Sequence, residues 1–125
     1  MEYFNKEIIG DIAIQKVTLP KATLIEAKVF WERLQTDISQ EQNKLIVDLS
    51  DCTFVDSTFM GVIVQAQRRL IENQGELKLV LPAEQMKEFF RFAGITRVIE
   101  TFQSMEEAVS SFNKEPDEVR EIAFV

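Results

Sequence analysis

An acid followed by two hydroxyl residues, Asp56, Ser57 and Thr58, is the stretch of this sequence best suited to chemistry. This triplet directly precedes apolar residues at helical spacing, so Asp56 is expected to cap a helix whose first turn holds both hydroxyls. Helix N-termini favour anions, and a phosphate on Ser57 would be tolerated there despite the charge of Asp56. Two interpretations therefore stay open: a helix cap with no further role, and a reversible phosphorylation site.

The rest of the chain offers little for catalysis. It contains no histidine, the most common general base and metal ligand, and a single cysteine, Cys52, which excludes an internal disulfide. Cys52 has no basic neighbour and is expected to be a buried, inert thiol. Asp48 and Asp51 lack the spacing of an aspartate phosphotransfer site. We therefore expect no cofactor, no metal and no enzyme, and a small α/β enzyme is the weakest alternative.

Composition and charge narrow the class of protein and of partner. The 125 residues are enough for one domain, and 46% of them are hydrophobic, as in ordinary globular proteins. A net charge of −7 argues against nucleic acid and anionic membranes, which attract clustered basic residues, and it favours a protein partner. Neither a membrane-spanning run nor a signal peptide is recognisable, so we expect a cytoplasmic protein.

The triplet is expected to follow a buried strand. The apolar run from Leu45 to Leu49 is typical of a parallel sheet, and a short polar break leads from it towards the triplet. The helix that follows has apolar residues at Phe59, Val62, Ile63, Ala66 and Leu70. Gly75 is expected to be its left-handed stop, and Leu77 to Leu81 a parallel strand reached by a right-handed crossover.

The residues before Leu45 predict a hairpin and a helix. Gly10 and Asp11 separate two short apolar runs, which favours an antiparallel hairpin at the sheet edge. Pro20 is expected to begin a helix that runs from about Ala22 to Ile38.

Two short helices are expected in the last third of the chain. The first contains Phe89, Phe90 and Phe92, which are expected mainly in the core. Because all three rings cannot face one side of a helix, either Phe89 or Phe90 is expected to be exposed. Val98 and Ile99 are expected to form a short last strand. The last helix should begin at Ser104, which has the spacing of a capping box.

From Leu45 to Phe112 the order and spacing of these segments resemble the STAS domain, a family named for sulfate transporters and anti-sigma factor antagonists. The matching segments are LIVDLSDCTFV, DST, FMGVIVQAQRRLIENQGE, LKLVLP, MKEFFRFAGITRVIETF and SMEEAVSSF. The resemblance implies an α/β fold with a four- to five-stranded mixed, mainly parallel sheet packed with about four helices. It assigns residues 1–112 to one domain and leaves 113–125 as a charged tail with an apolar end, either a frayed terminus or a docking segment.

In the antagonist branch that the chain resembles, the first hydroxyl after the acid is phosphorylated by an anti-sigma factor that is itself a protein kinase. That residue is Ser57 here, with Thr58 as a second acceptor. The resemblance implies that the unphosphorylated protein binds the kinase and frees a sigma factor, that phosphorylation releases the kinase, and that a phosphatase resets the cycle. The oligomeric state stays open, a homodimer included.

Two positions depart from the family pattern. Phe59 stands where many antagonists have glycine, and Lys21 stands where an acid is common; Lys21 is instead expected to pair with Asp56 or with a phosphate. The expected partner surface consists of Asp56, Ser57, Thr58, Phe59, Met60 and Lys21. The alternative is a scaffold or adaptor subunit of a signalling or transport complex, in which Ser57 only caps the helix.

Overall fold

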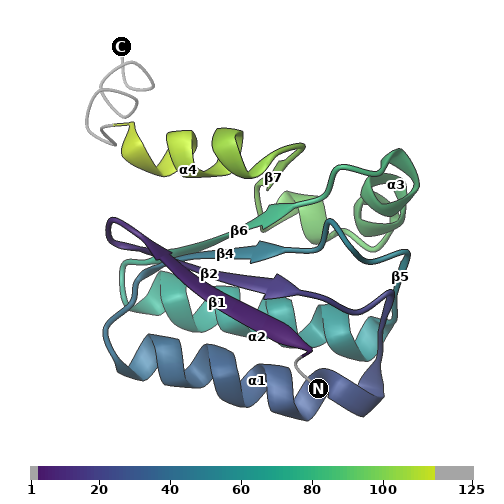
Figure 1. Ribbon diagram of the computed structural model, residues 1–125, viewed down its shortest axis with the longest axis horizontal. Helices are drawn as coiled ribbons and strands as arrows, with labels where there is room; N and C mark the ends of the chain where they lie inside the picture. The colour runs from purple at the N-terminus through teal and green to yellow at the C-terminus, as the bar shows by residue number, and fades with distance from the viewer. Residues whose placement is uncertain (1–2, 115–125) are drawn as a thin grey trace.

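Five strands form a mixed sheet in the order β1-β2-β4-β6-β7 (Figure 1). The computed structural model describes residues 3–114. β1 and β2 pair antiparallel, and every other neighbouring pair in this sheet is parallel. The strands are β1 (Phe4–Ile9), β2 (Ile12–Val17), β4 (Lys44–Asp48), β6 (Glu76–Val80) and β7 (Thr101–Phe102). The expected mixed, mainly parallel sheet with a hairpin at its edge is confirmed.

Helices cover the two faces of the sheet unequally. α1 and α2 lie side by side over one face, α4 lies over the other, and α3 lies near the carboxyl ends of the parallel strands (Figure 1). The described helices are α1 (Leu24–Ser39), α2 (Ser57–Glu72), α3 (Glu84–Phe92), the short 3-10 helix η1 (Ile95–Arg97) and α4 (Met105–Asn113). The carboxyl ends of the parallel strands and the N-termini of α1 and α2 therefore share one end of the molecule.

Two apolar layers hold the helices on the sheet. Residues alternate between the faces of a strand, so Leu45 and Val47 of β4 lie in the larger layer under α1 and α2, whereas Ile46 lies in the smaller layer under α4. In the larger layer the rings of Phe30 and Phe59 join the two helices. Because β4 is buried on both faces, its three central residues, Leu45, Ile46 and Val47, are all apolar.

A separate two-residue ladder places the starts of α1 and α2 beside each other. β3 (Lys21–Ala22) pairs parallel with β5 (Phe54–Val55), and the Asp56 N–H donates a hydrogen bond to the Ala22 carbonyl at 3.0 Å. Each of these two chain segments then enters a helix almost at once. Residues far apart in sequence thereby form one surface at the helix N-termini.

Two expected boundaries are wrong and one is confirmed. Pro20 does not begin α1, because the chain first forms β3 and Thr23 then caps the helix in a reciprocal capping box with Glu26. The last strand of the sheet is β7 rather than residues 98–99, which follow η1. Ser104 does begin α4 as expected, since its side chain accepts a hydrogen bond from the Glu107 N–H.

The fold requires glycine at position 75, but not as the left-handed helix stop that the sequence predicts. The left-handed residue after α2 is Gln74, at φ 64°, whereas Gly75 has no positive φ. A Cβ built on Gly75 would lie 2.4 Å from the carbonyl oxygen of Asn43. The glycine therefore permits a close approach between two backbones, just where the chain enters β6.

Candidate functional site

Asp56 holds the N-termini of two helices together. As the N-cap of α2, it accepts a hydrogen bond through Oδ1 from the Phe59 N–H at 2.9 Å, which is the capping role expected from the sequence. Its Oδ2 accepts a second hydrogen bond at 2.8 Å, from the Leu24 N–H at the start of α1. Both carboxylate oxygens are thus held by backbone donors, so Asp56 fixes the geometry of the site.

Ser57 and Thr58 lie in the first turn of α2, and both residues are exposed. Their backbone N–H groups donate no hydrogen bond to any residue that the structure describes. Unpaired donors at a helix start are the groups that hold anions in proteins. A phosphate on Ser57 would therefore reach both solvent and these donors, and phosphorylation of Ser57 stays a prediction.

Phe59 does not lie on the surface, contrary to expectation. Its ring is fully buried and stacks on Phe30, with 4.8 Å between the ring centroids, because its position on α2 faces the core. Met60 is also buried and contributes only to the floor of a groove beside the helix. The bulk of Phe59 therefore does not obstruct a protein that approaches Ser57.

Lys21 is exposed on β3, next to the site but not joined to it. Within residues 3–114 no ion pair links Lys21 to Asp56, whose oxygens are already occupied by the two backbone N–H groups. The expected pairing of Lys21 with Asp56 is therefore wrong. A role for Lys21 beside a phosphate stays a prediction.

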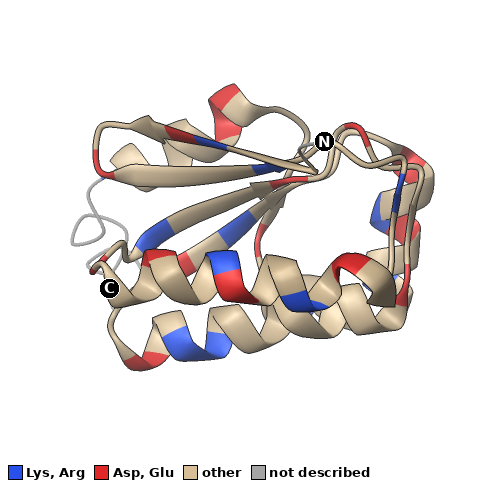
Figure 2. Ribbon diagram, turned by 60° about the horizontal axis from the view of Figure 1, so that its bottom comes forward, with Lys and Arg blue, Asp and Glu red and all other residues tan. Residues whose placement is uncertain are grey.

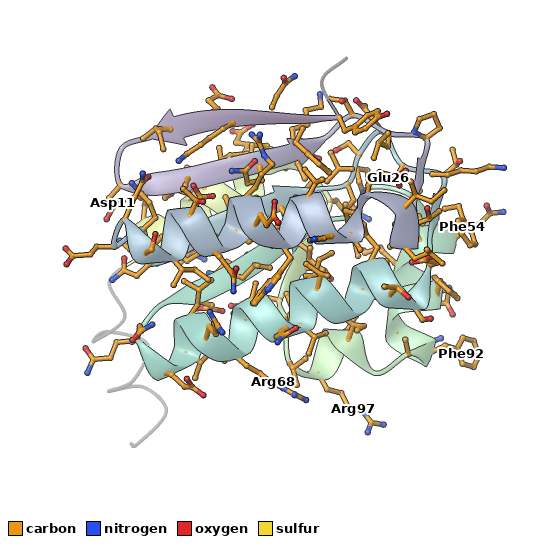
Figure 3. All side chains as sticks on the ribbon, turned by 90° about the horizontal axis from the view of Figure 1, so that it is seen from below. Asp11, Glu26, Phe54, Arg68, Phe92 and Arg97 are labelled. Carbon is orange, nitrogen blue, oxygen red and sulfur yellow. The ribbon has the colours of Figure 1, made fainter. Side chains whose placement is uncertain are left out.

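Exposed apolar side chains surround the starts of α1 and α2. Leu24 and Ile25 begin α1 with most of their surface in solvent, and Ile25 is 78% exposed. Figure 3 shows Phe54 of β5 and Phe92 of α3 at the same end of the molecule, pointing outwards. We call Leu24, Ile25, Phe54 and Phe92 the apolar rim. Apolar groups gathered in this way on a protein surface are typical of an interaction site.

The three phenylalanines of α3 divide between core and surface. Phe90 is fully buried, Phe89 is 43% exposed and Phe92 is 85% exposed. Exposure of Phe89 agrees with the sequence analysis, whereas the expected burial of Phe92 is wrong. Phe92 lies in the last turn of α3, and the guanidinium carbon of Arg91 lies 5.9 Å from the centroid of its ring.

A groove runs along α2 from the site towards η1. It has a volume of about 450 Å³. Its lining includes Ser57, Met60, Gly61, Val64, Arg68 and Ile95. Ser57 therefore belongs to two continuous surfaces, the helix start with its apolar rim and this groove.

The other candidates for chemistry take structural places. Burial, with smaller contributions from the charges of Asp51 and Asp48, raises the pKa of the Cys52 thiol to about 12. Cys52 is buried, as expected. Asp48 accepts a hydrogen bond from the Ser50 N–H at 2.9 Å in the turn after β4. Within residues 3–114, no cluster of three or more acidic, cysteine or histidine side chains could hold a metal ion.

With this geometry established, comparison with known proteins identifies the family. The family model of the STAS domain matches residues 3–108. The chain belongs to the STAS domain family. Two curated relatives, from Thermotoga maritima and Thermotoga neapolitana, are 25% and 26% identical, and the names of both contain the words "putative anti-sigma factor antagonist". The matches cover 89% and 85% of this chain and 98% and 94% of the relatives.

Solved structures of this STAS fold superpose on most of the chain. A crystal structure of a Thermotoga maritima protein of the same name has a TM-score of 0.80 at 23% identity, covering 89% of this chain and 95% of that one. The Bacillus cell fate determinant SpoIIAA, solved in its phosphorylated form, has a TM-score of 0.69 at 20% identity, covering 88% and 99%. At these identities the superpositions establish the fold.

Two further expectations concern the ends of the domain and the membrane. The family match ends at residue 108 and α4 ends at Asn113, close to the predicted domain boundary. The tail from residue 115 onwards lies outside the described residues, so its role as frayed end or docking segment stays a prediction. Among the helices of residues 3–114, none has the length and hydropathy needed to cross a membrane.

Proposed function

We propose that this STAS protein is an anti-sigma factor antagonist that binds an anti-sigma factor with serine kinase activity, under the control of reversible phosphorylation of Ser57. The names of the two Thermotoga relatives support the class of protein. The observation that carries the proposal is the position of the exposed Ser57 between unpaired helix N–H donors and the apolar rim. The protein acts by binding rather than catalysis, in the cytoplasm beside its kinase and phosphatase.

A phosphate on Ser57 would change how the site docks. It adds about −1.5 to −2 charges at neutral pH. A partner that covers the apolar rim would have to remove water from this charge, which is unfavourable unless new hydrogen bonds replace the water. In the free protein, solvent and the N–H groups of Ser57 and Thr58 stabilise the phosphate. Phosphorylation therefore favours the dissociated protein, and a phosphatase restores binding.

The proposal is tested with the anti-sigma factor kinase of the same organism, purified and incubated with ATP. Intact-mass spectrometry should show one phosphate on the wild type and none on Ser57→Ala, while the matched control Thr58→Ala is still phosphorylated. In calorimetric titrations without ATP, Ser57→Asp should bind the kinase at least about tenfold more weakly. Absence of phosphate together with unchanged binding of Ser57→Asp contradicts the switch. That outcome favours the adaptor alternative.

A further inference from the structure

The groove along α2 has an apolar floor with exposed backbone above it. Met60, Val64 and Ile95 supply buried or half-buried side chains on its floor, and Ser57 lies at its end. Ile95 of η1 lies on the opposite side, and Val98, the residue after η1, accepts a hydrogen bond of 2.9 Å from the Gln67 side chain of α2. The segment around η1 is therefore fixed to α2.

Gly61 is the residue of the groove that the fold itself does not explain. It lies inside α2, where glycine is less stable than alanine, and its φ is not positive. A Cβ built on Gly61 has no atom within 4 Å, so packing within residues 3–114 does not require glycine either. The missing side chain leaves helix backbone accessible at the groove, as a closely packed neighbouring segment would need.

The charge of the groove is opposite in sign to that of the whole chain. The net charge is −7, yet no carboxylate occurs between Ser57 and Ile71, or between Ala93 and Ile99. In Figure 2, the ribbon of α2 is uncharged from its start to two basic residues near its end. Arg68 lines the groove, and Arg97 lies outside the lining, two residues after Ile95. Both arginines are exposed and are the sequence neighbours of the hydrogen-bonded Gln67 and Val98. Figure 3 shows both arginines projecting from the same edge of the molecule.

We propose that this groove receives an acidic segment of the partner protein, with an apolar side chain seated over Gly61 and carboxylates beside Arg68 and Arg97. The inference rests on the proposed function for the choice of partner, and it specifies which chemistry that partner presents. A second copy of this chain fits less well, because a symmetric pairing of two grooves would place the arginines of one copy against those of the other. Opposite charges across an interface orient the partner and speed association.

Two short helical peptides with identical leucines, one carrying glutamates and the other lysines, test the groove without the natural partner. Titration of the labelled protein, followed by NMR, should shift the amides of Gly61, Gln65 and Ile95 with the acidic peptide and not with the basic one. Arg68→Glu and Arg97→Glu together should weaken binding of the acidic peptide about tenfold, since each replaces attraction by repulsion. Lys28→Glu, an equal charge change on the exposed side of α1, is the control for Arg68→Glu and should leave binding unchanged.

A steric variant tests the role of Gly61 itself. Gly61→Leu fills the open space above α2, so the acidic peptide should bind at least about tenfold more weakly while the protein stays folded. Gly61→Ala adds one methyl group and should have a smaller effect on binding. If Gly61→Leu binds as the wild type does, the seating of a side chain over Gly61 is wrong.

The outcomes separate this inference from the proposed function. Three results would overturn the proposal that the groove binds an acidic segment. They are equal amide shifts with both peptides, shifts confined to the apolar rim, and equal peptide binding by Arg68→Glu and Lys28→Glu. An Arg68-dependent dimer in sedimentation assigns the groove to a second copy and also overturns it. If the kinase phosphorylates Ser57 but binds the arginine variants normally, the groove inference fails and the switch stands. If the acidic peptide binds in the groove but no kinase modifies Ser57, the phosphorylation switch fails and the groove inference stands.

Discussion

The carboxylate of Asp56 accepts a hydrogen bond at 2.8 Å from the backbone N–H of Leu24, although 32 residues separate them in the chain. The same carboxylate caps α2 through the Phe59 N–H. This one carboxylate thus sets the spacing between Ser57 on α2 and the apolar rim at the start of α1. Asp56 would act on the proposed docking surface by positioning both of its sides, without having to touch the partner.

Replacement of Asp56 by alanine is expected to lower the free energy of unfolding by about 1–3 kcal/mol, because α2 loses its cap and the Leu24 N–H loses its acceptor. Urea denaturation followed by circular dichroism measures the loss. Asp51→Ala is the control: Asp51 is half exposed and 3.8 Å from Lys16, so the change should stay within about 0.5 kcal/mol. Equal losses would contradict the anchoring role of Asp56.

The buried position of Phe59 gives a second prediction. Phe59→Ala removes a fully buried ring that stacks on Phe30 and should cost about 3–5 kcal/mol. Phe92→Ala removes a ring that is 85% exposed and should change the free energy of unfolding by less than about 0.5 kcal/mol. Thermal and urea unfolding of both variants measure the difference. A mild effect at Phe59 would mean that its ring is not part of the core.

The sequence predicts the sheet and its helices because their signals are local. The run from Leu45 to Leu49 and the apolar spacing of α2 are each several residues long, and burial alone explains them. β3, β5 and β7 have two residues each and exist only because neighbouring strands pair with them. No periodicity can develop over two residues, so the sequence does not distinguish β7 from the apolar pair at residues 98–99.

The site was predictable in part. Asp56 as cap, with Ser57 and Thr58 in the first turn, follows from residue types and spacing. Phe59 belongs to the same apolar series as Ile63, and this spacing indicated burial, whereas the family's glycine at that position pointed to the surface. The spacing was the better guide because a helix turns one face to the core. The link from Asp56 to Leu24 has no local signal, since it depends on how β3 and β5 pair.

Gly61, inside α2, and Gly75, shortly after it, should respond in opposite ways to replacement by alanine. Gly75→Ala places a methyl group against the Asn43 backbone and should destabilise the protein by about 1–3 kcal/mol. Gly61→Ala meets open space within a helix and should stabilise it by about 0.5–1 kcal/mol. Melting temperatures of the two variants, measured in the same buffer, check the signs. A loss of stability in Gly61→Ala would show that the folded chain itself needs this glycine.

Cys52 should be unreactive in the folded protein and should make stability fall at high pH. Its pKa is raised from 9.0 to about 12, mainly by burial, so the native thiol stays protonated where the unfolded thiol ionises. The unfolded state therefore binds fewer protons above pH 9, and the free energy of unfolding decreases between pH 9 and 12. Ellman's reagent at pH 8 should react slowly with native protein and rapidly in urea. In Cys52→Ala this contribution to the pH dependence should disappear, and fast native labelling would contradict burial.

Ser57→Asp should leave the stability of the protein nearly unchanged. An added carboxylate in the first turn of α2 is favoured by about 0.3–1 kcal/mol through the helix dipole, and repulsion from Asp56 opposes it. The Ser57 side chain forms no hydrogen bond with residues 3–114 that the change would break. The melting temperature should therefore shift by less than about 4 °C, measured beside the calorimetric titration with the kinase. If the melting temperature stays within this range, weaker binding by Ser57→Asp is caused by the added charge on the proposed docking surface. A larger drop in melting temperature would attribute the weaker binding to unfolding.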